Sequence, residues 1–265
     1  MTNSRLSVPS LFLGLALASS SLYGLSPTSS LTISGKSAGT RTGLYLIAGD
    51  NVRLTAAGQV NTLPPDPGSR ATPRGNGVPC TFSCLLPSAQ FGALIGRIGD
   101  QGPWFLVGSS LTLNATQTGM LHLAVNDTIH NNNIGQFAVT TKVTANASFT
   151  CAASSTALCL RGDRFRVQVF WRLPDGSTGN GQVSGCGASE SGIFWFFTAA
   201  NLELLMKVLD GCGSNDSYWV FAAATTTLEF TLRVRDTHTG EVKMYFNPQG
   251  RPADALTDFG AFPGC

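Results

Sequence analysis

The stretch GMLHLAVNDTIHNNNIGQFAVTTKV, residues 119–143, decides how the first half of the chain folds. Two apolar runs flank a polar segment, which predicts two strands joined by a loop. The loop holds five Asn or Asp residues within eight positions, Asn126 to Asn133. A turn needs one such side chain, whereas Ca²⁺ takes six to eight oxygen ligands and accepts Asn carbonyls beside carboxylates. The segment is either an ordinary polar loop between strands or a loop that holds a cation.

Strand-like runs continue on the N-terminal side of this stretch at a spacing of about ten residues, as in a sandwich or barrel. They include GALIGRIG at 92–99 and WFLVGSSLTLNA at 104–115. Residues 61–79 contain five prolines, which exclude a central strand or a helix. We expect a long surface loop there.

The second half repeats the strand signals without copying the first. DRFRVQVFWRLPDGSTG, residues 163–179, alternates apolar and polar residues and ends in an Asp-Gly turn. NLELLMKVLDGCG, residues 201–213, suits a helix as well as a buried strand, and the β-rich surroundings favour a strand. The chain is thus predicted to be all-β, with two consecutive β-sandwich domains of jelly-roll or immunoglobulin-like type. We place them at residues 25–146 and 147–265, with a short link near Asn146.

The N-terminal residues 1–24, MTNSRLSVPSLFLGLALASSSLYG, have the pattern of a signal peptide. Their apolar core, residues 11–18, is far shorter than the roughly 20 residues of a spanning helix. We therefore expect an exported protein with no transmembrane segment, which is secreted, periplasmic or held at the cell surface. Charged residues make up only 12% of the chain and the net charge is +2, which argues against nucleic acid as a partner.

Seven cysteines in an exported chain indicate disulfides before metal binding or catalysis. We predict the pairs Cys80–Cys84, Cys151–Cys159 and Cys212–Cys265, which leaves Cys186 without a partner. A bridge between Cys186 and Cys212 is the alternative pairing.

The order AGDNVRLTAAG, a Pro/Gly loop, FGALIGRIGD and then GMLHLAVNDTIHNNNIGQFAVT resembles the bacterial calcium-dependent galactose-binding lectins of the lectin-A type. The resemblance covers residues 43–143. It implies a bound calcium with Asp127, Asn132, Asn133 and the backbone carbonyl of Thr62 as ligands. It also implies that Asp127 and Asn132 contact the sugar.

Two departures from the family pattern bear on that site. The loop is about two residues shorter, and Asn131 adds an amide. The family segment that contacts sugar through a His and a Gln corresponds here to SRATPRGNG, residues 69–77, which has neither residue.

Residues 149–265 resemble a module found at the C-termini of exported bacterial proteins, through runs such as CLRGDRFRVQVFW and FPGC. The resemblance implies no activity. Aromatic residues such as Phe194, Trp195 and Trp219 are expected mostly in the core, where large rings dominate burial, although exposed ones could stack on sugar rings.

The motifs HExxH and the phosphate-binding glycine loop are absent from the chain. We expect a non-enzymatic carbohydrate-binding or adhesion protein whose partner is a glycan or cell-surface carbohydrate. The alternative is a structural protein of the cell envelope that keeps the fold without the ligand. The sequence does not indicate an oligomeric state.

Overall fold

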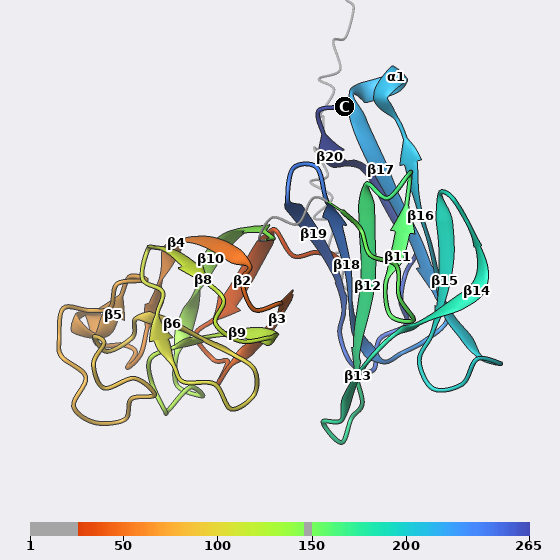
Figure 1. Cartoon of the computed structure of the whole chain (residues 1–265). Coiled ribbons are helices and arrows are strands. Elements are labelled where there is room, and N and C mark those ends of the chain that lie inside the picture. Colours follow the sequence, from red (N-terminus) through yellow and green to blue (C-terminus); the bar gives the residue numbers. More distant parts are fainter. Residues whose placement is uncertain (1–25, 146–149) are drawn as a thin grey trace, which may run out of the picture.

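The computed structural model describes residues 26–145 and 150–265, and within them it is almost entirely β-structure (Figure 1), as predicted. Its helical elements are α1 (Cys212–Asn215) and the 3-10 turn η1 (Pro67–Ser69). No helix in these ranges has the length and apolar character needed to cross a membrane. The predicted signal peptide, residues 1–24, and the domain boundary predicted near Asn146 lie outside the described residues.

The strands of the first half are short, apart from two of eleven residues that pair along their full length. They are β1 (Ser26–Pro27), β2 (Ser30–Ser34), β3 (Thr40–Leu46), β4 (Asn51–Asn61), β5 (Arg70–Ala71), β6 (Leu94–Ile98), β7 (Phe105–Leu106), β8 (Ser110–Asn114), β9 (Gly119–Val125) and β10 (Ile134–Thr144).

The second half contains all the remaining described strands, and residues 202–210 of the ambiguous segment 201–213 form one of them. They are β11 (Leu158–Leu160), β12 (Phe165–Arg172), β13 (Thr178–Asn180), β14 (Gln182–Ala188), β15 (Ser191–Trp195), β16 (Leu202–Asp210), β17 (Ser217–Ala224), β18 (Glu229–Asp236), β19 (Glu241–Asn247) and β20 (Leu256–Pro263).

In the first half a four-stranded sheet, β3-β9-β6-β7, packs against the sheet that contains β2, β10, β4 and β8. Alternation decides which face of β10 is buried: Phe137, Val139 and Val143 enter the core and Thr141 on the same face is also buried, while the alternate residues Ala138, Thr140 and Lys142 are exposed. Strand β9 is buried along its whole length, because Leu121, Leu123 and other residues of one face meet that core and its other face is also covered. The stretch quoted first thus supplies one strand to each layer.

The second half forms its own core between the five-stranded sheet β14-β15-β16-β17-β20 and the strands β11, β12, β18 and β19. The side chains of Phe165, Phe194, Phe230 and Phe262 are among the largest that are fully buried there. Each half therefore has the layered β-sandwich architecture predicted from the strand spacing.

The two halves share one sheet, which the sequence did not indicate. Strand β10 pairs with β19 at Val143↔Val242 and Thr144↔Glu241, so an eleven-stranded sheet runs from β11 through β19 and β10 to β5. Strand β1, from the beginning of the described chain, also pairs with β19. Figure 1 shows the two halves side by side at this junction.

Side chains also join the halves where β3 approaches β18 and β12. The ring of Tyr45 stacks on Phe170 with centroids 3.9 Å apart, and the Thr231 hydroxyl donates to the Gly43 carbonyl at 3.0 Å. Gly43 has φ +78°, and a Cβ there would overlap the side chain of Phe246. The close approach of the two halves requires glycine at this position.

The predicted disulfides Cys80–Cys84, Cys151–Cys159 and Cys212–Cys265 are all present, and Cys186 is an exposed free cysteine. Cys212 is bonded to Cys265 in this structure and not to Cys186.

Candidate functional site

The loop ends predicted to bind calcium lie at one end of the first sandwich, where β4 and β9 end and β10 begins. Thr62 directly follows β4, and Asn133 directly precedes β10. The β4–β10 register pairs Asn61 with Ile134, so Thr62 and Asn133 are neighbours across the two strands. Two of the four predicted ligands are thus brought together by strand pairing.

The turn that carries Asp127 is linked to the end of β4 through Gly92, in the segment before β6. The Gly92 amide donates to the Asn126 carbonyl at 3.1 Å, and a Cβ built on Gly92 would lie 3.4 Å from Cγ2 of Thr62. Gly92 therefore contacts both the turn that carries Asp127 and the residue that follows β4.

Asn126 fixes the start of the loop, a role that the sequence analysis missed. Its side-chain oxygen accepts the Leu86 amide at 2.8 Å, and its nitrogen donates to the carbonyls of Leu86 at 2.9 Å and Gln90 at 3.0 Å. These bonds use the whole amide, so Asn126 positions Asp127 and is not a ligand candidate. The residues that Asn126 bonds lie 36 and 40 positions away in the sequence, so no local sequence pattern predicts these hydrogen bonds.

Three buried side-chain oxygens of the loop have no hydrogen-bond partner among the described residues: Asp127 Oδ2, Asn132 Oδ1 and Asn133 Oδ1. Asp127 and Asn133 are 1% and 0% exposed. The other polar atoms of these two side chains are engaged: Asp127 Oδ1 accepts the Ile129 amide at 2.8 Å, and Asn133 Nδ2 donates to the Gly35 carbonyl at 3.0 Å. Each side chain is thus held in place by one hydrogen bond and keeps one buried oxygen that has no hydrogen-bond partner.

The chemistry of these atoms suits a hard cation. Buried polar atoms are normally hydrogen-bonded, and an unsatisfied one costs about 1 to 3 kcal/mol. A carboxylate oxygen and two amide oxygens belong to the set that Ca²⁺ prefers. Thr62 is 2% exposed and is fixed by its amide and hydroxyl, which both donate to the Ser69 carbonyl. Asn131, the amide beyond the family pattern, is exposed and adds no buried oxygen.

Gln90 lies beside the segment expected to contact sugar, residues 69–77. The Gly77 amide donates to Gln90 Oε1 at 2.9 Å, so a glutamine borders the segment although the segment itself contains none. Because Gln90 comes from 13 residues further along the chain, the local sequence gave no signal for it.

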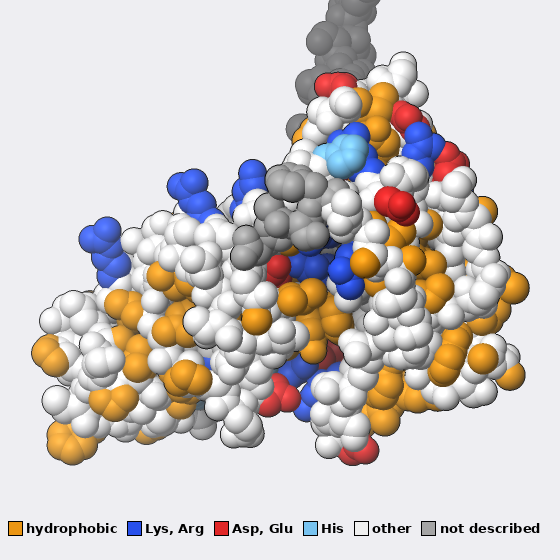
Figure 2. All heavy atoms as spheres, viewed as in Figure 1, with side chains coloured by type: hydrophobic (Ala, Val, Ile, Leu, Met, Phe, Trp, Pro, Cys, Tyr) orange, Lys and Arg blue, Asp and Glu red, His pale blue; other side chains and the backbone are white. Residues whose placement is uncertain are grey.

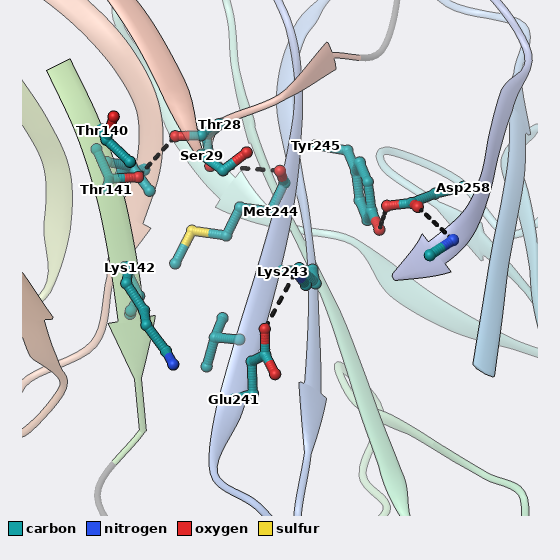
Figure 3. Close-up of a pocket in the computed structure, with 14 residues that line it drawn as sticks. Thr28, Ser29, Thr140, Thr141, Lys142, Glu241, Lys243, Met244, Tyr245 and Asp258 are labelled. Carbon is teal, nitrogen blue, oxygen red and sulfur yellow. Dashed lines mark hydrogen bonds and ion pairs between the residues drawn. The ribbon is translucent and has the colours of Figure 1, made fainter. Parts of the chain in front are cut away.

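A cavity of about 540 Å³ lies at the junction of the two halves, between β10, β19 and β20 (Figure 3). Its polar groups are largely bonded to one another. The Tyr245 hydroxyl donates to Asp258 at 2.8 Å, Lys243 pairs with Glu241 at 3.1 Å, and the Thr141 hydroxyl donates to the Thr28 carbonyl at 2.7 Å. Such internal pairing points to a structural junction.

The aromatic residues of the second half divide between core and surface. Phe194 and Phe196 are buried, as expected, whereas Phe197 is 49% exposed. Trp219 is half-buried and makes an edge contact with Phe259, which is 51% exposed.

No protein-family model and no curated protein matches the chain. A comparison with solved structures found a similar chain described as "EclA N-terminal domain; PllA-like lectin". The two are 24% identical over 44% of this chain and 96% of that chain, with a TM-score of 0.36. A TM-score of this size supports no functional conclusion for this chain, so the lectin-A resemblance of residues 43–143 remains a prediction.

Proposed function

We propose that this chain is a carbohydrate-binding protein whose first half holds a calcium-assisted sugar site at the loop between β9 and β10. The observation that carries the proposal is the set of three buried, unpartnered oxygens on Asp127, Asn132 and Asn133. An ordinary polar loop would turn such oxygens toward water or toward its own amides. Here the ends of β4, β9 and β10 and the hydrogen bonds of the Asn126 side chain hold the three oxygens in the interior.

Asp127, Asn132, Asn133 and the Thr62 carbonyl would hold the ion. These residues supply four oxygens, fewer than the six to eight that Ca²⁺ takes, so positions remain for water or for ligand hydroxyls. Bound calcium would supply direct coordination of two sugar hydroxyls. Asp127 and Asn132 would then accept hydrogen bonds from the same hydroxyls. With one carboxylate in the set, we expect a Kd in the weak range typical of extracellular sites, about 10⁻⁴ to 10⁻³ M.

The first experiment is thermal and urea denaturation of the protein in about 10 mM CaCl₂ and again in EDTA. A ligand that binds only the folded state adds RT ln(1 + [L]/Kd), which is about 2.7 kcal/mol at a hundredfold excess over Kd. Asp127→Asn keeps the oxygen that accepts the Ile129 amide and removes the charge, so the calcium-dependent gain should disappear.

Asp175→Asn is the matched control. Asp175 also accepts an amide two residues on, from Ser177 at 2.8 Å, but it is exposed in the second half of the chain. This variant should keep the full response to calcium. Identical melting in calcium and EDTA for the unmodified protein would refute the metal site and leave the structural alternative in the cell envelope.

Sugar binding is tested separately by titration calorimetry with galactose, followed by a glycan array. Binding in calcium that is lost in EDTA and in Asp127→Asn supports the proposal. Calcium-dependent stability without binding to any glycan would refute the sugar site while leaving the ion in place.

A further inference from the structure

Five large apolar side chains are exposed at the end of the first half that carries the loop between β9 and β10. Each is at least 50% exposed, and Phe82 is 85% exposed. Figure 2 shows orange side chains gathered at this end of the molecule, over the loops that flank β5 in Figure 1. We call these residues the apolar tip, and they are all but one of the exposed large hydrophobic residues described in the first half: Leu63, Val78, Phe82, Ile129 and Ile134.

A backbone hydrogen bond and a disulfide hold the most exposed part of the apolar tip in place. The Thr128 amide donates to the Ser83 carbonyl at 2.9 Å, which joins the loop of Ile129 to the loop of Phe82. The disulfide Cys80–Cys84 closes the loop that carries Phe82. The aromatic ring is therefore kept in solvent by a closed loop that is bonded to its neighbour.

The other members of the apolar tip are placed at the same end by pairing. Ile134 stands opposite Asn61 in the β4–β10 register, and Leu63 follows Asn61 by two positions. The Phe91 amide donates to the Val78 carbonyl at 3.1 Å, which places Val78 beside the segment before β6. Contiguous exposed apolar residues of this kind mark an interaction surface, whereas single ones do not.

Three exposed cations flank the same loops. Lys36 follows the residue whose carbonyl accepts the Asn133 amide, Arg70 belongs to β5, and Arg74 lies in the loop after β5. None of the three forms a salt bridge with another described residue. Asp66 is the only exposed carboxylate of the described loops at this end. The rim of the apolar tip is therefore positively charged.

The composition of this surface distinguishes among the partners that could cover it. Four of its five apolar side chains are aliphatic, and a platform for sugar rings would instead consist of aromatic rings. A second copy placed on it by a twofold axis would bring the three cations toward the same three cations. An anionic bilayer matches both features, because apolar side chains enter the boundary of the acyl chains while basic side chains meet the phosphate headgroups.

We propose that the apolar tip docks this chain on an anionic phospholipid surface. Phe82 and Ile129 enter the interface, and Lys36, Arg70 and Arg74 lie at the level of the headgroups. This docking needs neither calcium nor a sugar. It therefore stands or falls separately from the proposed carbohydrate site.

The test is co-sedimentation of the full chain with vesicles in EDTA and without any sugar. Vesicles of mixed phosphatidylcholine and phosphatidylserine should bind the protein, and added salt should weaken that binding, because the headgroup attraction is screened. Vesicles of pure phosphatidylcholine should bind it more weakly. Absence of binding to the mixed vesicles, or equal binding to both kinds, would overturn the proposal.

Phe82→Ser tests the apolar contribution. The vesicle affinity should fall about tenfold or more, since the variant loses the burial of a whole aromatic side chain in the interface. Phe82 is exposed in the free protein, so urea denaturation of the variant should match that of the unmodified protein. Phe259→Ser is the matched control, because Phe259 is also exposed but belongs to β20 in the second half. An unchanged affinity in Phe82→Ser, or an equal loss in both variants, contradicts docking through the apolar tip.

Arg70→Gln tests the charged rim. One basic residue near an anionic surface contributes a factor of about five in affinity, so binding to the mixed vesicles should fall about fivefold. Arg53→Gln is the control, since Arg53 is an exposed arginine near the other end of β4 and its loss changes the net charge equally. Equal losses in the two variants would show that net charge alone governs binding, which is incompatible with a defined docking surface.

Two further measurements identify the other possible occupants of this surface. Sedimentation equilibrium that finds a dimer, with Phe82→Ser a monomer, would assign the apolar tip to a second copy and overturn membrane docking. Titration calorimetry with galactose in calcium, in which Phe82→Ser loses sugar binding but keeps its vesicle affinity, would assign the ring to the sugar site and overturn it as well.

Discussion

Arg41 on β3 joins the two halves, because it bonds acidic groups in each of them. Its guanidinium bonds Glu229 of β18 at 2.9 Å and Asp100 at 2.6 Å. Asp100 in turn contacts Nε2 of His122 on β9 at 2.9 Å. The network places His122, 5% exposed, among two charges of opposite sign at the edge of the interface. A buried imidazole in this position makes stability depend on pH.

The pKa of His122 is lowered to about 4, because burial disfavours the charged ring and Arg41 repels it, while Asp100 opposes both effects. The unfolded chain takes up a proton near pH 6.5 that the folded chain takes up only near 4. The contribution of His122 to stability is therefore complete above pH 6.5 and is lost as the pH falls from 6.5 to 4. One proton gives a slope of at most about 1.4 kcal/mol per pH unit.

Urea denaturation between pH 7.5 and 4.5 checks this, with His122→Gln as the comparison. The unmodified protein should lose more stability over that window than the variant. The pKa values of Asp100 and Asp236 are lowered below the usual value for Asp, so these groups lose their contributions at lower pH. Parallel pH profiles for the two proteins would show that His122 is not the group responsible.

At the level of single residues, the sequence identified the oxygen-rich loop but not what surrounds it. Asp127 and Asn133 stand out because Asx residues cluster beside apolar runs. Gln90, Arg41 and Arg233 do not stand out, since the groups they bond lie far away in the sequence or outside their own strands. Arg166 and Arg235 look like the polar positions of alternating strands, and only the sheet register shows that they face each other.

Among the elements, β9 and β10 were predictable because the pattern of apolar residues in each strand follows from how many of its faces are buried. Strand β10 alternates because one of its faces is buried, and β9 is apolar except for His122 because both of its faces are buried. The proline content of residues 61–79 correctly indicated a loop, which in the structure holds only η1 and β5. The pairing of β10 with β19 was not predictable, because two residue pairs leave no pattern in either strand.

Strand β20 depends on a disulfide as well as on pairing. It lies at the edge of its sheet beside β17, and Cys265 beyond its end is bonded to Cys212 in α1, 53 residues earlier. Replacing Cys212 and Cys265 together by Ser should lower the free energy of unfolding by about 2 to 4 kcal/mol, because the unfolded chain gains the freedom of an open loop.

Cys186→Ser is the control for this element. Cys186 is exposed and free, so its replacement should change stability by no more than about 0.5 kcal/mol, as at other surface positions. Urea denaturation of both variants measures the difference. Equal losses, or peptide mapping under non-reducing conditions that links Cys186 to Cys212, would contradict the assignment.

For the molecule as a whole, the shared sheet and the covered face of β18 argue for one cooperative unit. Every residue of β18 is buried: Phe230, Leu232 and Val234 face the core of the second half, while Thr231 and Arg233 meet the first half. Separation of the halves would expose Arg233 and Asp50 as unpaired charges in a newly opened surface. The sequence predicted consecutive domains, and the structure adds an interface between them, which we expect to couple their stabilities.

Gly43→Ala tests that coupling, because the added Cβ meets Phe246 of the other half at a φ of +78°. Overpacking of this kind costs about 1 to 3 kcal/mol. Gly39→Ala, directly before β3, is the control, with no atom within 4 Å of the added carbon, and should be close to neutral. Hydrogen exchange of the most protected amides in β9 and β16 reports the two cores separately. Cooperative unfolding requires that Gly43→Ala lower protection equally in both strands, since each core would then open only with the other. A loss confined to β9 would mean that the halves unfold independently despite the shared sheet.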